Sequence, residues 1–160
     1  MRGMYSLVGA RGVVERDLVS GSERELIRRE GWIMGAGMTG SVSLSPDGRS
    51  IATLYADGST KSHVVLLIPV SGGEPRELLR ASQSELLYCL AWTPDGGAVL
   101  VTRGGQLVVL PAAGGTPRTI DVGSTSVACP AVHPDGRQIA FVGIGDDKPE
   151  VWVLEHFLPR

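Results

Sequence analysis

Apolar residues occur along this chain in short segments, and turn-forming residues separate these segments at nearly regular spacing. Residues 50–55, 98–102 and 138–142 are the clearest cases, because each is mostly apolar and each follows a Pro-Asp-Gly turn. Short apolar segments bounded by Gly, Pro and Asp are typical of β-strands joined by tight turns. The 22 glycines and 10 prolines agree with many such turns. We therefore predict an all-β protein.

The Pro-Asp-Gly turn occurs three times, at residues 45–48, 93–96 and 133–136, and Ser, Thr or His precedes it. The copies follow one another at intervals of about 40 to 48 residues. An internal repeat of this length is typical of propellers and solenoids, in which each repeat is one supersecondary unit. The aspartate and the glycine of the turn have local reasons to be there, because aspartate bonds the downstream backbone and glycine adopts a positive φ.

Alignment on the turns gives four predicted strands in a full unit, the innermost apolar and the outermost polar. One strand precedes the turn, one follows it, a third comes after a hairpin, and the fourth comes after a Gly-Gly-x-Pro-Arg loop. Four antiparallel strands of this kind make one propeller blade. The predicted strands of the three units are 40–44, 50–55, 63–68 and 76–79; 88–92, 98–102, 106–110 and 118–121; and 128–132, 138–142 and 150–154.

The two ends of the chain carry incomplete units. We predict a single propeller segment over residues 1–160, with an incomplete first blade (1–30), two blades (40–80 and 86–122) and a last blade without its outer strand (126–158). About three and a half blades are fewer than the four that a closed ring usually needs. We expect either a homodimer that completes a ring, with residues 24–27 of one copy supplying the missing strand of the other, or upstream blades that this chain lacks.

The repeat resembles a known family. Residues 45–52 read Ser-Pro-Asp-Gly-Arg-Ser-Ile-Ala, degenerate copies follow at 93–100 and 133–140, and the Gly-Gly-x-Pro-Arg loops accompany them. These motifs are similar to those of TolB-like, WD-repeat-like β-propellers, and residues 150–159 look like the C-terminal end of bacterial members, some of which follow a Ser/Thr kinase domain. The resemblance implies a propeller with no shared set of catalytic residues. Family propellers have six or more blades, so this chain matches their C-terminal part.

Charge and hydropathy exclude several classes of partner. The net charge is −2 and there is no basic run, so we expect no nucleic-acid partner. No apolar stretch is long enough to span a bilayer, and the first residues do not read as a signal peptide. The sequence is that of a cytoplasmic protein or of an internal part of an exported one, and the compartment stays unknown.

The chain has no motif that indicates catalysis. It contains no nucleophile elbow, phosphate-binding loop or dinucleotide fingerprint. His63, His133 and His156 lie in different contexts of the repeat, so a three-histidine metal site is not expected. We predict no catalytic residue, no cofactor and no metal, and therefore no enzyme.

Two cysteines, Cys89 and Cys129, lie at equivalent positions of successive units, each five residues before its proline. Equivalent positions are expected to point in the same rotational sense. A disulfide needs facing Cβ atoms about 4 Å apart. We therefore predict two small buried thiols and no disulfide.

Three residues are candidates for contacts with a protein partner. Trp32 lies in a glycine-rich connector and Arg103 at the tip of a tight hairpin, and Trp and Arg are enriched in binding hot spots. His133 ends an inner strand, where it could line a channel mouth or cap its own turn. The sequence favours a non-catalytic protein-interaction or scaffold propeller, part of a larger TolB-like or kinase-linked sensor protein. The alternative is an accessory propeller of a prolyl-oligopeptidase-type serine hydrolase, whose catalytic domain is not in this chain.

Overall fold

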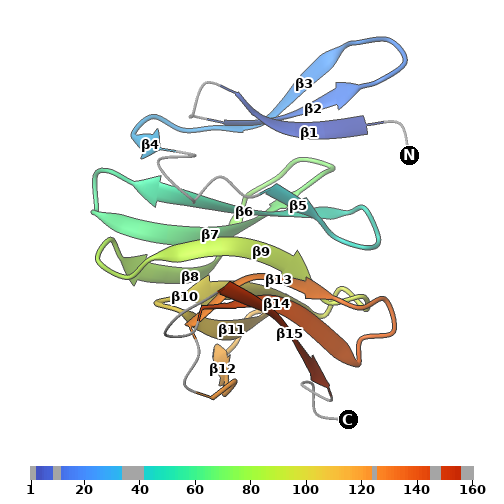
Figure 1. The fold of residues 1–160 in the computed structure, drawn as a ribbon. Coiled ribbons are helices and arrows are strands. Elements are labelled where there is room, and N and C mark those ends of the chain that lie inside the picture. The colour runs from blue at the N-terminus through green and yellow to red at the C-terminus, as the bar shows by residue number, and fades with distance from the viewer. Residues whose placement is uncertain (1–2, 9–11, 34–41, 124–125, 145–148, 156–160) are drawn as a thin grey trace.

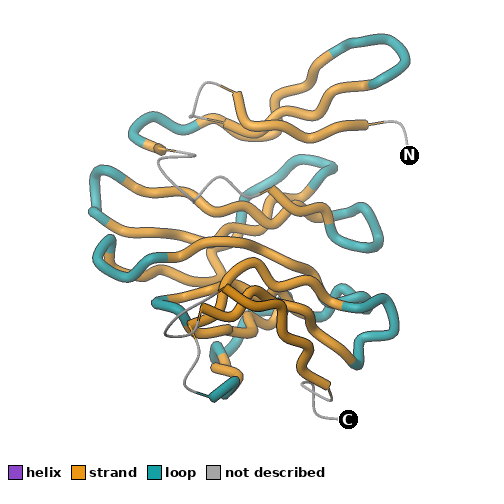
Figure 2. The backbone as a smooth tube through the Cα atoms, in the orientation of Figure 1, coloured by secondary structure: helices purple, strands orange, loops and turns teal. Residues whose placement is uncertain are grey.

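The computed structural model describes residues 3–8, 12–33, 42–123, 126–144 and 149–155, and within these ranges the regular structure is entirely β (Figures 1 and 2). No helix in the described ranges has the length and apolar character that a membrane crossing requires. The strands are β1 (Gly3–Val8), β2 (Gly12–Asp17), β3 (Glu23–Arg28), β4 (Trp32–Ile33), β5 (Val42–Leu44), β6 (Ser50–Asp57), β7 (Ser62–Pro69), β8 (Arg76–Ser82), β9 (Leu87–Trp92), β10 (Ala98–Arg103), β11 (Gln106–Pro111), β12 (Arg118–Ile120), β13 (Ser126–Val132), β14 (Gln138–Ile144) and β15 (Pro149–Glu155).

The strands form four antiparallel sheets that follow one another in chain order, from β1 at one end of the molecule to β15 at the other (Figure 1). The first sheet has the order β1-β2-β3, the third β9-β10-β11-β12, and the fourth β13-β14-β15. In the second sheet β6, β7 and β8 are consecutive, and β4 and β5 both pair with β6. The predicted all-β class is confirmed.

The connector after the first sheet contains a strand that the sequence pattern did not predict. β4 pairs with the end of β6, where Trp32 lies opposite Asp57, and β5 pairs with the start of the same strand. Two short segments thus share one edge of β6. A two-residue strand leaves no periodic signal, since alternation needs at least four residues to be visible.

Apolar contacts between neighbouring sheets form the core. One cluster lies between the first and second sheets, two lie between the second and third, and one lies between the third and fourth. The buried members of the last cluster are Ala98, Leu100, Leu107, Val109, Ile120, Val127, Ile139 and Phe141.

The central strands of the middle sheets, β6, β7, β10 and β11, are buried on both faces, and alternate residues serve different interfaces. In β6, Ile51 and Tyr55 pack toward the first sheet, whereas Leu54 packs toward the third. In β10, Leu100 faces the fourth sheet and Val101 faces the second. Successive side chains of a strand point to opposite faces, so a strand between two sheets must be apolar at nearly every position.

Arginines near the start of the outermost strands link the first sheet to the second and the second to the third. Arg24 is the second residue of β3, the outer strand of the first sheet, and donates a 2.8 Å hydrogen bond to the carbonyl oxygen of Val70. Arg76, at the matching place in the second sheet, donates to the carbonyl oxygens of Ala112 and, at 2.7 Å, Ala113. In both cases the acceptor lies in the loop that follows the third strand of the next sheet. The repeat therefore encodes contacts between units as well as strands.

We predict that Arg76→Ala lowers the free energy of unfolding by about 1–2 kcal/mol, because two carbonyl groups of the third sheet lose a charged donor. Urea denaturation of the purified chain measures this. Arg49→Ala is the control, since Arg49 is exposed and, within the described ranges, donates no side-chain hydrogen bond to another sheet; a change within about 0.5 kcal/mol is expected for it. Equal effects of the two substitutions would contradict the proposed link.

Candidate interaction surface

The three Pro-Asp-Gly turns lie at one end of the inner strands and share one hydrogen-bonded design. Asp47 Oδ1 accepts from the hydroxyl of Ser45 at 2.6 Å and from the amide of Arg49 at 3.0 Å. Asp95 Oδ1 accepts from the hydroxyl of Thr93 at 2.6 Å and from the amide of Gly97 at 2.9 Å. Each carboxylate is thus used to hold its own turn, as predicted.

Neighbouring turns also touch. A Cβ added to Gly96 would lie 3.9 Å from Cδ of Pro46, and one added to Gly136 would lie 3.9 Å from Cδ of Pro94. The proline of each turn therefore lies against the glycine of the next, so that the three turns form a row. Both glycines have a positive φ, which any other residue would adopt only with strain.

The hydrogen bonds keep these turn acids ionised. The Ser45 hydroxyl holds the pKa of Asp47 below its ordinary value, and the Thr93 hydroxyl does the same for Asp95. The amide of Arg137 lowers the pKa of Asp135, with His133 as the next contribution. An ionised carboxylate that is already bonded to its own loop is a structural group and a poor proton donor.

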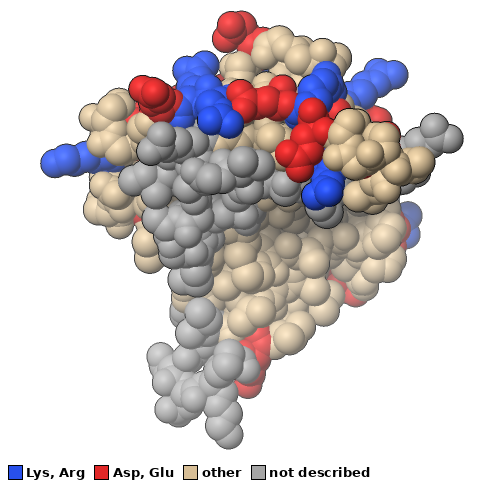
Figure 3. Space-filling view, turned by 90° about the horizontal axis from the view of Figure 1, so that it is seen from above, with Lys and Arg blue, Asp and Glu red and all other residues tan. Residues whose placement is uncertain are grey.

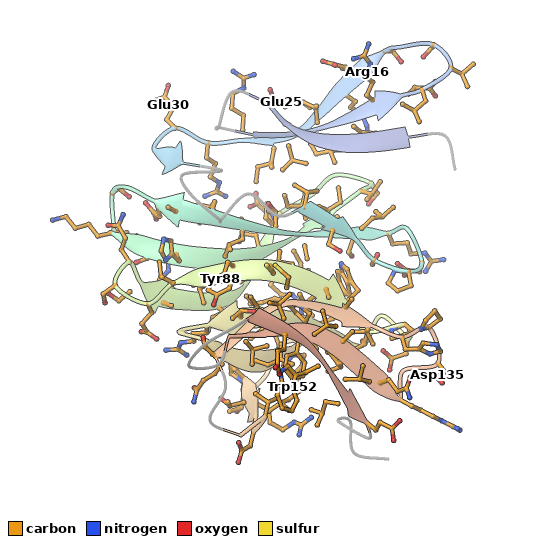
Figure 4. All side chains as sticks on the ribbon, viewed as in Figure 1. Arg16, Glu25, Glu30, Tyr88, Asp135 and Trp152 are labelled. Carbon is orange, nitrogen blue, oxygen red and sulfur yellow. The ribbon has the colours of Figure 1, made fainter. Side chains whose placement is uncertain are left out.

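His133, one of the three predicted contact residues, belongs to the last of these turns. Its Nδ1 lies 2.9 Å from Asp135 Oδ1 and 3.3 Å from the Asp135 amide nitrogen, and its side chain is 54% exposed. The imidazole therefore caps its own turn, like Ser45 and Thr93 in the other units, and still presents a surface to solvent. Figure 4 shows Asp135 at this edge of the molecule.

Arg103 and Trp32 lie at the opposite end of the sheets. Arg103 ends β10 and its Nε donates a 2.6 Å hydrogen bond to Glu85 Oε2, so the guanidinium is held by the β8–β9 loop. The backbone carbonyl of Glu85 accepts in turn from Nδ1 of buried His63 at 2.9 Å. Trp32 pairs through its backbone with Asp57, and its side chain lies outside the described part of the structure. The structure thus brings two of the three candidates to one end and leaves His133 at the other.

Other charged groups at the Arg103 end are also paired. Arg80 contacts Glu77 at 2.6 Å and Asp57 at 3.4 Å, and Asp57 accepts from the Ser59 hydroxyl at 2.6 Å. The Ser59 bond holds the pKa of Asp57 far below its ordinary value, and Glu77 raises that of Arg80. Asp146 and Asp147, adjacent acids that the sequence offers as cation ligands together with Asp57 or Glu150, lie outside the described residues. Over the described ranges, no three His, Cys, Asp or Glu side chains gather as metal ligands would.

The cysteines contradict the predicted burial and the predicted direction of their side chains. Both are free thiols, but Cys89 Sγ lies 2.6 Å from Cys129 Sγ, and Cys129 is exposed where burial was expected. Equivalent side chains point the same way only when units are related by translation. Here β9 and β13 lie side by side as the inner strands of neighbouring sheets (Figure 1), and units related by rotation let equivalent side chains converge.

The last sheet exposes large apolar residues on both of its faces, which the sequence pattern did not indicate as a contact surface. Val151, Trp152 and Val153 of β15 are 78%, 47% and 59% exposed, although all three are large apolar residues. β15 is hydrogen-bonded to β14 and forms an edge of the described sheet. The sequence did contain an indication of this exposure. Residues 150–154 form an apolar predicted third strand, and no fourth strand follows to cover it.

Comparison with solved structures identifies the architecture. TolB from Acinetobacter baumannii superposes with a TM-score of 0.73 at 21% identity, over 96% of this chain and 38% of TolB. The chain has the fold of a TolB-like β-propeller segment. The four sheets are therefore propeller blades. Kuenenia stuttgartiensis hydrazine synthase gives 0.71 at 17% identity over 97% of this chain and 50% of that chain. A chain of the nidogen–laminin complex gives 0.68 at 10% identity, over 97% and 56%.

The propeller segment spans between 38% and 56% of these matched chains, which is less than two thirds of each. No protein-family model and no curated protein sequence matches it. The proteins that share the fold differ in what they do, so the similarity concerns architecture alone.

We predict that the propeller segment loses stability in acid. The folded-state pKa values of Asp47, Asp95 and Asp135 are lowered, so the unfolded chain binds more protons than the folded one as the pH falls below about 4. Stability from these groups is complete above about pH 5 and decreases below about pH 4. Urea midpoints measured between pH 7 and pH 2 test this.

Asp95→Asn gives the matched comparison. It removes one titrating carboxylate and weakens its turn, so the variant is less stable at pH 7 but loses less on acidification. Parallel pH profiles of the variant and the wild type would contradict the role assigned to Asp95.

Proposed function

We propose that this chain is a non-catalytic protein-binding part of a larger TolB-like propeller, and that its last blade is where further β-structure docks. The observation that carries the proposal is the apolar outer face of that blade. Val151 and Val153 both lie on it, and within residues 150–155 they are the most exposed apolar residues.

Strand alternation defines this face. Phe141 and Ile139 of β14 are buried against the third blade, and their cross-strand partners are Trp152 and Leu154. Val151 and Val153, opposite Val142 and Ala140, therefore point to the other side. All the interior blades bury the corresponding face against a neighbour, and an exposed apolar patch of this kind marks an interaction site.

The opposite end of the stack is different in character. Arg16 and Glu25 project from the first blade, far from Trp152 (Figure 4). Seen from that end, Lys, Arg, Asp and Glu side chains gather along one border of the molecule (Figure 3). Within the first blade, Arg16 pairs with Glu23 and Arg28 with Glu25. Charged outer strands discourage non-specific edge pairing. The apolar docking surface is thus at the C-terminal end of the described stack.

The chemistry of the described polar residues supports a binding role and not catalysis. The turn carboxylates are engaged with their own turns, and Arg103 and Arg80 are paired with acids. Enzyme sites instead place a base and a nucleophile in mutual reach inside a cleft.

The partner that fits the apolar face is another propeller blade. Blades pack on blades by the same alternating apolar residues that form the interior interfaces here. A second copy of this chain would supply four more sheets, within the usual four to eight blades of a ring. Blades of a longer chain would satisfy the same face. In the structure, β3 already pairs with β2, so we favour docking of whole blades over the donation of residues 24–27.

The Arg103 end of the segment is the second contact surface that we propose. Leu86 is exposed beside the Glu85–Arg103 ion pair, and Trp32 belongs to a strand at the same end. An apolar side chain flanked by an arginine held in one geometry suits a protein contact. His133 would contact a partner at the opposite end of the sheets, where the Pro-Asp-Gly turns lie.

Light scattering after size exclusion tests the docking proposal. We expect a dimer for the wild type, and a shift toward monomer for Val153→Lys, because a buried unpaired ammonium is costly at an apolar contact. Val19→Lys is the matched control: Val19 is 83% exposed but lies in the β2–β3 turn of the first blade. It should leave the mass unchanged.

Hydrogen exchange of residues 149–155 provides a second measurement. Backbone amides of β15 should be slower to exchange in the wild-type dimer than in the Val153→Lys monomer. A wild type that stays monomeric, with the same exchange as the variant, would exclude docking of a second copy. A longer chain with additional blades that also leaves β15 unprotected would exclude the docking role altogether.

A further inference from the structure

We propose that Cys89 and Cys129 are a disulfide-forming pair that links the inner strands of the last two blades covalently under oxidising conditions. The observation is the placement of two free thiols, 40 positions apart in the sequence, with their sulfur atoms 2.6 Å apart. A movement of roughly half an ångström brings them to the length of a disulfide bond.

The backbone shows that this placement is built into the strands. Cys89 has φ 52° and Cys129 φ 46°, and the one other non-glycine residue with a positive φ in the described ranges is Lys61, in a turn. Both cysteines lie at β-bulges, where the registers of β9 with β10 and of β13 with β14 shift. A left-handed conformation in a strand is unfavourable for a residue with a side chain, and bulges redirect side chains.

Neighbouring contacts hold the two bulges together. The hydroxyl of Tyr88 donates a 3.1 Å hydrogen bond to the carbonyl oxygen of Val127, and the amide of Val127 donates to Gly105 at 2.8 Å. These bonds hold β13 against the third blade just before each cysteine, since Tyr88 precedes Cys89 and Val127 lies two residues before Cys129. The thiols therefore meet because hydrogen bonds hold the two inner strands against each other, and not through movement of a loop.

The two thiols differ in accessibility, which assigns them different roles. Cys129 is exposed and Cys89 is partly buried. Burial, together with the neighbouring Cys129, raises the pKa of Cys89 to about 11. Cys129 would therefore react first with a small disulfide in solution, and Cys89 would act as the resolving thiol.

The reaction is thiol–disulfide exchange with a low-molecular-weight disulfide as the oxidant. The Cys129 thiolate attacks one sulfur of the small disulfide, and the first small thiol leaves with an electron pair and takes up a proton. The Cys89 thiolate then attacks Cys129 Sγ and displaces the second small thiol. The two cysteines lose two protons and two electrons in total, and the small disulfide is reduced to two thiols.

The consequence is a covalent link that the hydrogen-bonded fold otherwise lacks. A disulfide that closes a long loop restricts the unfolded chain and stabilises the folded one. Here it would join the third blade to the last blade, whose far side is the exposed face described above. The proposal does not depend on what docks on that face.

Intact mass spectrometry of the full chain tests the proposal. The wild type is equilibrated with reduced and oxidised glutathione, quenched with acid, and then unfolded in denaturant near pH 7 in the presence of N-ethylmaleimide. We expect the wild type to lose two hydrogen atoms and to take up no maleimide. Cys89→Ser and Cys129→Ser should each show one glutathione adduct or one maleimide. Serine stands at the matching repeat position, Ser41, so we expect both variants to fold.

Thermal melting gives an independent readout. The oxidised wild type should melt roughly 5–10 °C above the reduced wild type. The melting temperatures of the two serine variants should not respond to the glutathione ratio. Two glutathione adducts or two maleimides on the wild type, or a disulfide-linked dimer in its place, would overturn the proposal.

Discussion

The face-to-face packing of one small sheet on the next is the interaction on which the rest of this structure depends. A sheet of three to five short strands cannot bury enough apolar surface alone. Leu54 and Val65 are fully buried because the third blade covers them, and Leu100 and Leu107 because the fourth blade does. The arginine links from Arg76 to the next blade add to this packing and repeat with it. Stability is therefore shared between neighbours and belongs to no single blade.

The same constraint explains why function is proposed at the end of the stack. Interior blades have a neighbour on both faces, and the last described blade has one on a single face. The residues that an additional blade would cover, Val151 and Val153, remain apolar although solvent surrounds them. The polar turns, by contrast, satisfy their own hydrogen bonds, with Asp47 and Asp95 bonded to the backbone that they shape. The proposed binding face and the polar Pro-Asp-Gly turns are thus formed by different residues.

Rotation between the units has a chemical consequence at the inner strands. β9 and β13 lie side by side, and a bulge in each brings Cys89 and Cys129 together. The repeat places a cysteine at the same position of two successive units. Because the inner strands of these units lie side by side, the two cysteines become neighbours. A repeat protein can build a paired site in this way from a single motif that occurs twice.

The all-β class, the order of the strands around each Pro-Asp-Gly turn and the role of the turn aspartates can all be predicted from the sequence. These features are local: alternation, Pro-Asp-Gly chemistry and a repeat of about 40 residues depend on neighbours along the chain. It did not predict β4, the sulfur contact or the ion pair that holds Arg103. These features depend on strand pairing across a connector, on the rotation between blades and on the direction of a side chain at a bulge. Contacts between residues far apart in the chain set all three, so no local pattern reveals them.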